Sequence, residues 1–273
     1  MATKLKKSEW DRAAAFWDAE AGEKGIWHQE HDIDPVVLKV LGGVRNKRIL
    51  EIGCGNGYFS RMLARRGAKV IGTDLSSKLI GFALMREKEK PLGIRYLVRD
   101  AAHLRDLKTK SFDIVTGNMC LMDIADAKAA IREASRVLRP NGRFVFSIIH
   151  PIFHPHSKHR HIFKKDGKKY FGYTVYRYLS PAAEKFVIWA SGVKATAYHR
   201  PIEVYIRYLR AAGLLVETFE EIATNKKVKR AKKGEKGVKW RRSRYRTSAE
   251  KKMKEMALRE LPQFLVVGAT KVR

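Results

Sequence analysis

A segment near the start of the chain alternates glycine with other residues directly after an acidic side chain. It consists of Glu51, Ile52, Gly53, Cys54, Gly55, Asn56 and Gly57. Glycine is needed where the backbone turns sharply or approaches a ligand with no Cβ in the way. The dinucleotide fingerprint G-x-G-x-x-G would require a third glycine at the position that Tyr58 occupies. The spacing therefore favours a turn that binds a different ligand, with an ordinary turn between a strand and a helix as the alternative.

The residues on either side of this turn show two different apolar patterns. Before it, the short apolar run at 49–52 indicates a buried strand. After it, Phe59, Met62 and Leu63 recur at helical spacing, so a helix is expected to begin close behind Gly57. A helix start offers unpaired N–H groups and the positive end of the helix dipole.

Two acidic residues lie at the ends of the next two predicted strands. Asp74 follows the turn by about twenty residues, where doubly wound folds place an acid that accepts hydrogen bonds from ribose hydroxyls. Asp74 could instead cap the following helix, but Ser76 or Ser77 can do so and would leave Asp74 free for a ligand. Asp100 lies at the end of the third strand and could likewise bind a ligand. The alternative is that Asp100 is an exposed charge in a loop.

The apolar patterns continue through the rest of the chain. They predict strands over 49–52, 69–74, 94–101, 112–118, 143–149, 214–219 and 263–269. A helix over 124–138 and a turn over 139–142 separate the fourth and fifth strands.

The glycine run, both acids and the 138–142 turn occur in an order that resembles the class I S-adenosylmethionine-dependent methyltransferases over residues 47–149. The chain is most similar to the small-molecule methyltransferases near the ubiquinone and menaquinone enzymes. This resemblance implies an α/β fold: a Rossmann-like, doubly wound, seven-stranded sheet, mostly parallel with an antiparallel last strand. It also implies S-adenosylmethionine as cofactor, bound at the carboxyl ends of the strands.

The resemblance also implies which residues bind the cofactor. They are Glu51, Gly53, Cys54, Gly55, Asn56, Gly57, Asp74, Leu75, Asp100, Ala101, Asn118 and Met119. Glu51 would orient the turn and the amino-acid end of the cofactor. Asp74 would hold the ribose, and Asp100 with the N–H that follows it would read the adenine. The backbone of Asn118 and Met119 would border the methionine moiety.

Three segments lie outside this core. Residues 1–46 are expected to form a helical segment that either packs on the domain edge or covers the cofactor as a lid. Within the methyltransferase domain, 47–273, an irregular insertion over 150–200 would cover the substrate, and a basic insertion would occupy 222–262. His150 directly follows the fifth strand and is the candidate general base, with a structural histidine as the alternative.

The acceptor is the least determined part of the function. The segment 118–123 lacks the motifs of adenine- and cytosine-methylating enzymes, which favours an oxygen or nitrogen nucleophile of a small molecule. The net charge of +29 favours contact with a polyanion. The segment Lys226–Arg246 is rich in Lys and Arg, with Trp240 and Tyr245 among them, a composition that suits RNA docking or a solvated loop. A cofactor-binding regulator without catalysis is the third hypothesis.

Location and metal content are predicted from what the chain lacks. It has no apolar run of 18 or more residues and no apolar signal core near its first residue, so no membrane insertion is expected. Both cysteines, Cys54 and Cys120, fall in predicted core segments, which favours a reducing, cytoplasmic location. The histidines over 150–161 lack companion ligands at recognised spacing, so no metal is expected.

Overall fold

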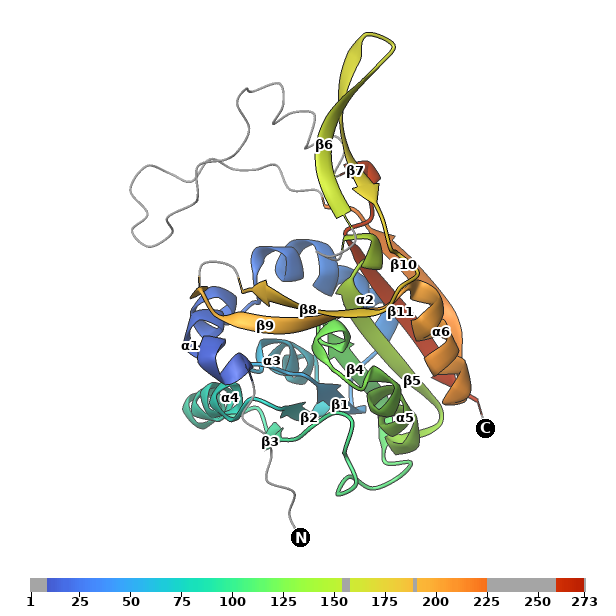
Figure 1. Cartoon of the computed structure of the whole chain (residues 1–273). Helices are drawn as coiled ribbons and strands as arrows, with labels where there is room; N and C mark the ends of the chain where they lie inside the picture. Colours follow the sequence, from blue (N-terminus) through green and yellow to red (C-terminus); the bar gives the residue numbers. More distant parts are fainter. Residues whose placement is uncertain (1–8, 154–157, 189–190, 225–258, 273) are drawn as a thin grey trace.

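The structure is a computed structural model that describes residues 9–153, 158–188, 191–224 and 259–272 (Figure 1). The predicted nucleic-acid-docking segment, Lys226–Arg246, lies outside the described residues. None of the described helices is both long enough and apolar enough to cross a bilayer.

Seven strands form the central sheet in the order β10-β11-β5-β4-β1-β2-β3. Their bounds are β1 Arg48–Ile52, β2 Lys69–Asp74, β3 Arg95–Val98, β4 Phe112–Asn118, β5 Leu138–Ile149, β10 Leu214–Ile222 and β11 Phe264–Lys271. The pairs among β1 to β5 are parallel, whereas β11 runs antiparallel to both β5 and β10. The predicted seven-stranded Rossmann-like sheet with an antiparallel last strand is therefore confirmed, and that last strand is inserted between β5 and β10.

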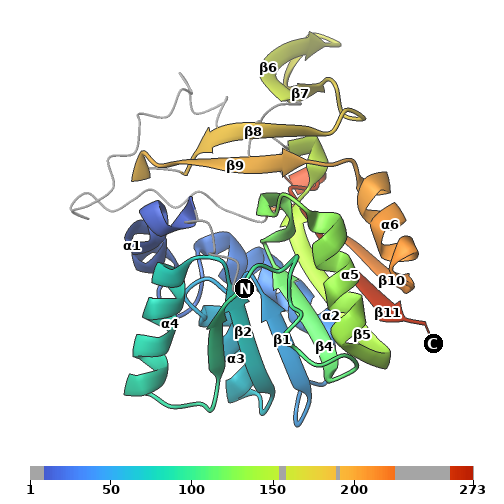
Figure 2. The ribbon, with the colours of Figure 1, turned by 60° about the horizontal axis from the view of Figure 1, so that its bottom comes forward.

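Helices cover both faces of the sheet (Figure 2). Their bounds are α2 Asp34–Leu41, α3 Tyr58–Arg65, α4 Ser77–Glu89, α5 Ala127–Val137 and α6 Ile202–Ala211. Alternate residues of β1 point to opposite faces, so Ile49 joins the core under α2, α3 and α4, while Leu50 and Ile52 join the core under α5 and α6. This two-sided burial explains why the strands read as apolar runs.

The N-terminal helix α1, Trp10–Ala21, packs against α4. Asp11 accepts hydrogen bonds from the Ser76 hydroxyl at 2.7 Å and from the Lys78 N–H at 3.2 Å. Asp18 and Arg86 form an ion pair with a shortest N–O distance of 2.6 Å. These contacts fix α1 on the rim of the sheet, next to the carboxyl ends of β1 and β2.

The insertion over 150–200 was predicted to be irregular, and this prediction is wrong. It forms two antiparallel hairpins, β6 Lys158–Lys165 with β7 Lys168–Val175, and β8 Ala182–Val187 with β9 Lys194–His199. The β8–β9 hairpin lies across the carboxyl edge of the sheet and packs on α1 through Ala13 and Ala195 (Figure 2). In β9 the buried residues Ala195 and Ala197 alternate with Lys194 and Thr196, but alanine is a weak strand signal in a sequence.

Two further boundaries differ from the prediction between β4 and α5 and at the start of β5. Leu121–Asp123 forms a 3₁₀ turn and Asp126 caps α5 by accepting the Ala129 N–H, so α5 begins later than expected. β5 already begins at Leu138, and the predicted turn is reduced to a bend in that strand at Asn141, whose φ is 62°.

Candidate active site

The three alternating glycines form a left-handed turn between β1 and α3. Gly53, Gly55 and Gly57 have φ values of 64°, 56° and 78°, a region that side chains other than glycine adopt only with strain. A Cβ on Gly53 would lie 2.4 Å from Cβ of Cys120, and one on Gly57 would lie 2.5 Å from the Tyr96 hydroxyl. Internal packing therefore requires the first and third glycines.

The middle glycine has a different surrounding. Among the described residues, a Cβ on Gly55 would meet no neighbouring atom closer than Nε1 of Trp17, at 4.0 Å. The bare backbone at Gly55 therefore faces open space below α1, which is what a turn needs in order to admit a ligand. Trp17 borders this space while α1 packs on α4, and the role of the N-terminal helix as a lid stays a prediction.

Two predicted cofactor residues have side chains that hold the turn itself. Asn56 is buried, accepts the Tyr58 N–H at 3.2 Å and donates to Asp18 and to the Gly22 carbonyl at 2.9 and 3.1 Å. The Cys54 side chain is buried in the core under α3. We therefore assign these two side chains to fastening the turn rather than to contacting a ligand.

A buried arginine adds to this fastening. Arg61, on α3, is 1% exposed and donates to the Asn56 carbonyl at 2.7 Å and to the Gly22 carbonyl at 3.4 Å. Its guanidinium also pairs with Glu23 at 3.3 Å. Sequence patterns could not reveal this role, because Gly22 and Glu23 lie almost forty residues before Arg61 in the chain.

Asp74 lies at the carboxyl end of β2, beside the turn. Its Oδ2 accepts the Gly55 N–H at 2.9 Å and its Oδ1 accepts the Ser76 N–H at 2.8 Å. Ser76 caps α4, as predicted, by accepting the Leu79 N–H, but Asp74 is not free as the sequence suggested. Burial raises the pKa of Asp74. Leu75 is 38% exposed beside it, an apolar surface next to a carboxylate.

Asp100 follows β3 and remains partly exposed. Its Oδ1 accepts the Ala102 N–H at 2.9 Å, and its Oδ2 lies 3.3 Å from Nδ1 of His103. Ala101 is buried beside it. Asp100 therefore closes its own loop and keeps an accessible carboxylate at the same edge of the sheet as Asp74.

Asn118 ends β4 in a buried polar network, and Met119 follows it. The Asn118 amide donates to Oδ1 of Asp34 at 2.7 Å and to the Tyr58 hydroxyl at 2.9 Å, and it accepts from Ser147 at 2.5 Å. Burial raises the pKa of Asp34 to about 7. The network fixes the end of β4 against three other elements, and Met119 turns above it with a φ of 58°.

Glu51 is buried below the glycine turn, where the Ser60 hydroxyl donates to its carboxylate. Burial raises the pKa of Glu51 to about 8, and the nearby carboxyls of Asp34 and Asp74 add to the increase. Glu51 thus supports the turn from inside the fold, and its position agrees with the predicted role in orienting the turn.

The buried Glu51 carboxyl predicts a pH-dependent stability. Its pKa is higher in the folded chain than the ordinary value of 4.5, so the folded state binds more protons and the free energy of unfolding should fall as pH rises from 4.5 to about 8. The slope from one such group is at most about 1.4 kcal/mol per pH unit. Denaturant titrations at several pH values should show a flatter profile for Glu51→Gln than for the exposed control Glu20→Gln. Equal profiles would contradict the buried-carboxyl explanation.

His150 has both ring nitrogens engaged. Its Nδ1 accepts the Ile152 N–H at 3.3 Å, which leaves the proton on Nε2, 3.0 Å from Oε1 of Glu221. Burial lowers its pKa. This geometry favours the structural alternative for His150 and leaves no nitrogen free to accept a proton from a substrate.

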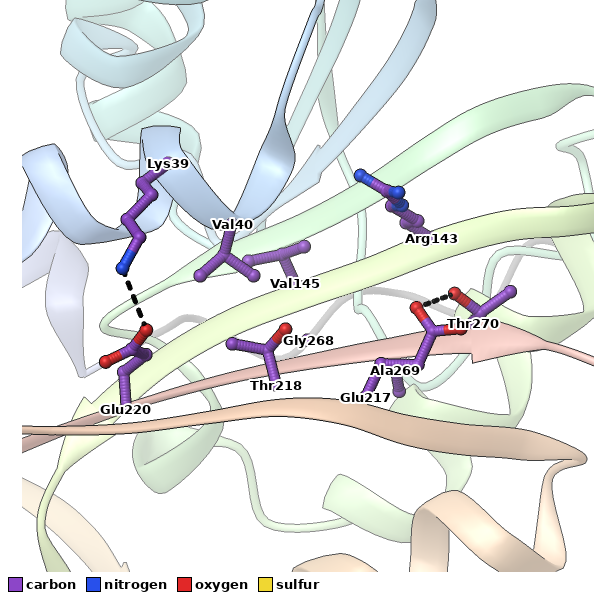
Figure 3. A pocket seen from close by; sticks show the side chains of 10 residues that line it. All are labelled: Lys39, Val40, Arg143, Val145, Glu217, Thr218, Glu220, Gly268, Ala269 and Thr270. Atoms are coloured by element: carbon purple, nitrogen blue, oxygen red, sulfur yellow. Dashed lines mark hydrogen bonds and ion pairs between the residues drawn. The ribbon is translucent and has the colours of Figure 1, made fainter.

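A separate cavity of about 290 Å³ lies between α2 and the strands β5, β10 and β11 (Figure 3). Within the cavity, Lys39 forms an ion pair with Glu220 at 3.1 Å, and Glu217 accepts a hydrogen bond from the Thr270 hydroxyl at 2.6 Å. It contains none of the predicted cofactor residues, so we place the candidate site at the glycine turn.

A glycine turn after β1, acids after β2 and β3, and a 3-2-1-4-5 strand order with an inserted antiparallel strand define the class I methyltransferase fold. A family model described as a methyltransferase domain matches residues 50–146. These residues therefore belong to the methyltransferase domain family, and the family prediction from the sequence is confirmed.

Individual relatives agree with this assignment. Ubiquinone biosynthesis O-methyltransferase from Alkalilimnicola ehrlichii is 32% identical over 147 residues, 52% of this chain and 58% of the relative. The protein of the same name from Hahella chejuensis is 32% identical over 150 residues, 54% of this chain and 61% of the relative. The chain thus matches less than two thirds of these curated relatives. The crystal structure of an S-adenosylmethionine-dependent methyltransferase from Mesorhizobium loti is 28% identical, with a TM-score of 0.65, covering 87% of this chain and 96% of that one.

Proposed function

We propose that the protein transfers a methyl group from S-adenosylmethionine to an oxygen or nitrogen nucleophile of a small molecule. The observation that carries this proposal is the open backbone at Gly55, bordered by the Asp74 carboxylate and by Trp17. The named activity of the matched relatives, ubiquinone biosynthesis O-methylation, supports a small acceptor.

The residues present fit this cofactor. Asp74 and Asp100, at the ends of adjacent parallel strands, would accept hydrogen bonds from the ribose and the adenine, and exposed Leu75 would contact the adenine ring. The bare Gly53–Gly57 backbone would admit the amino-acid end, supported from below by Glu51. Trp17 would cover the site from α1.

When bound, the cofactor supplies an electrophilic methyl group on a sulfonium whose leaving group is a neutral thioether. The protein therefore has little acid catalysis to perform on that side. Its main contribution is to hold acceptor and methyl group in line, an effect that reaches about 7–11 kcal/mol in ideal intramolecular reactions. The β8–β9 hairpin and α1 enclose the carboxyl edge, so they would exclude water from it.

The function is tested by incubating the protein with methyl-labelled S-adenosylmethionine and either a panel of small phenols and amines or cell-extract fractions. Label in a small-molecule fraction is the expected result, together with calorimetric binding of S-adenosylhomocysteine. Label in RNA would favour the nucleic-acid alternative. Binding without transfer to any fraction would indicate a cofactor-binding regulator, and absence of binding would overturn the proposal.

A further inference from the structure

The 3₁₀ turn Leu121–Asp123 carries a carboxylate that the cofactor site does not use. It begins three residues after the end of β4, at the carboxyl edge of the sheet. Cys120, the residue before it, donates from Sγ to the Ile52 carbonyl at 3.2 Å and packs under Gly53. Asp123 therefore lies three residues beyond a direct contact with the glycine turn.

This turn is held in place by the insertion. Arg200, the residue after β9, is 7% exposed and donates to the carbonyls of Leu121, Ile124 and Ala125 at 3.4, 2.8 and 2.7 Å. The Asp123 N–H closes the turn on the Cys120 carbonyl at 2.9 Å. Arg200 therefore donates its hydrogen bonds to backbone carbonyls and not to the Asp123 carboxylate.

Within the part of the chain that the structure describes, the Asp123 side chain has no structural partner. It is half-buried, and among the described residues its carboxylate makes no hydrogen bond and no ion pair. By contrast, Asp74 accepts two backbone N–H groups and Asp126 caps α5. A half-buried carboxylate on a rigid turn, unpaired beside a proposed reaction site, is suited to receive a proton from a bound molecule.

We propose that Asp123 is the general base of the reaction and that it takes the proton from the acceptor hydroxyl or amine. The inference rests on the proposed function. As the acceptor lone pair forms a bond to the methyl carbon, the carbon–sulfur bond breaks and its electron pair goes to sulfur. The acceptor proton passes to Asp123. The sulfonium and the Asp123 carboxylate both become neutral, so the step removes these two opposite charges from the enclosed site.

The charges around Asp123 agree with this role. Burial raises its pKa to about 8, Asp74 adds to the increase and Arg200 opposes it. Cys120 and Tyr205 also lie within electrostatic range, and burial raises the pKa of both. A bound sulfonium adds a positive charge, which favours the ionised carboxylate. Cofactor binding would therefore favour the ionised form of Asp123, which can accept a proton. His150 cannot serve as this base because both of its ring nitrogens are engaged.

The first test compares acceptors of different acidity. The assay uses catechol and 4-nitrocatechol, of which the second is far more easily ionised. It compares wild type with Asp123→Asn and Asp123→Glu. The matched control is Asp126→Asn, since asparagine can still cap α5. General-base catalysis contributes about 10²- to 10⁴-fold. Asp123→Asn should lose at least about a hundredfold in kcat with catechol, recover most of it with 4-nitrocatechol, and regain rate as pH rises. Asp123→Glu should retain part of the rate. Equal losses on both acceptors would overturn the inference.

The second test needs no acceptor. Calorimetry in buffers of different ionisation enthalpy measures the protons released when S-adenosylmethionine or S-adenosylhomocysteine binds near pH 7. Wild type should release more protons with the sulfonium than with the thioether, and Asp123→Asn should lose that difference. An unchanged difference would overturn the inference. If wild type binds neither cofactor, the proposed function fails instead, so the two failures are distinguishable.

Discussion

A chain with Gly55→Ala is expected to fold and to bind S-adenosylmethionine at least tenfold more weakly than wild type, a loss of about 1.4 kcal/mol or more. The added Cβ meets no protein atom closer than 4.0 Å, so it would occupy the space reserved for the ligand. The left-handed φ of 56° adds about 1–2 kcal/mol of backbone strain to the folded state. Calorimetric titration and thermal unfolding separate the two effects.

Two other glycines serve as controls for this experiment. Gly53→Ala places its Cβ 2.4 Å from Cβ of Cys120, so this variant should lose stability by about 1–3 kcal/mol from overpacking in addition to strain. Gly93→Ala has a similar positive φ of 75° and no atom within 4 Å, so it should show the strain alone and bind normally. Normal binding by a folded Gly55→Ala chain would refute the proposed site.

Asp74→Ala is expected to weaken cofactor binding about tenfold or more, or at least about 1.4 kcal/mol. Removing the carboxylate would eliminate the proposed ribose contacts and would also leave the Gly55 and Ser76 N–H groups without their acceptor. An unsatisfied buried donor costs about 1–3 kcal/mol, so the variant should also be less stable and is best titrated at low temperature. Asp106→Ala, an exposed carboxylate paired with Arg99, is the matched control.

A loosened turn could also weaken binding, so the ribose contact needs its own measurement. The design is a cycle that combines Asp74→Ala with an S-adenosylhomocysteine analogue lacking both ribose hydroxyls. If Asp74 binds those hydroxyls, removing them should weaken binding to the wild type and hardly change binding to the Asp74→Ala variant. Additive losses would show that Asp74 acts only by holding the turn.

Most elements of the sheet could be read from the sequence because their local patterns are strong. Apolar runs marked the parallel strands, Ser76 was one of the two predicted caps for α4, and the residue ranges of β2 and β4 match those predicted. These features depend on near neighbours along the chain, where burial of both sheet faces and helix capping act directly. The β8–β9 hairpin escaped prediction because its place depends on contacts with α1 and with the sheet edge.

The candidate site also has features that the sequence could predict and features that it could not. Its position was predictable, but the work of individual side chains was not: Asn56 fastens α1, and His150 is held by Glu221 and a backbone N–H. Asp123 had no sequence signal at all, since its significance comes from an arginine that is distant in sequence and occupied elsewhere.

By itself, the sequence determined that this chain makes a parallel sheet with a bare-backbone turn and acids at its carboxyl edge, because glycine, buried strands and strand-terminal acids follow local rules. Only the tertiary structure decided which of those polar groups remain available to a ligand. Each buried donor or acceptor must find a partner, and those partners come from elements far apart along the chain.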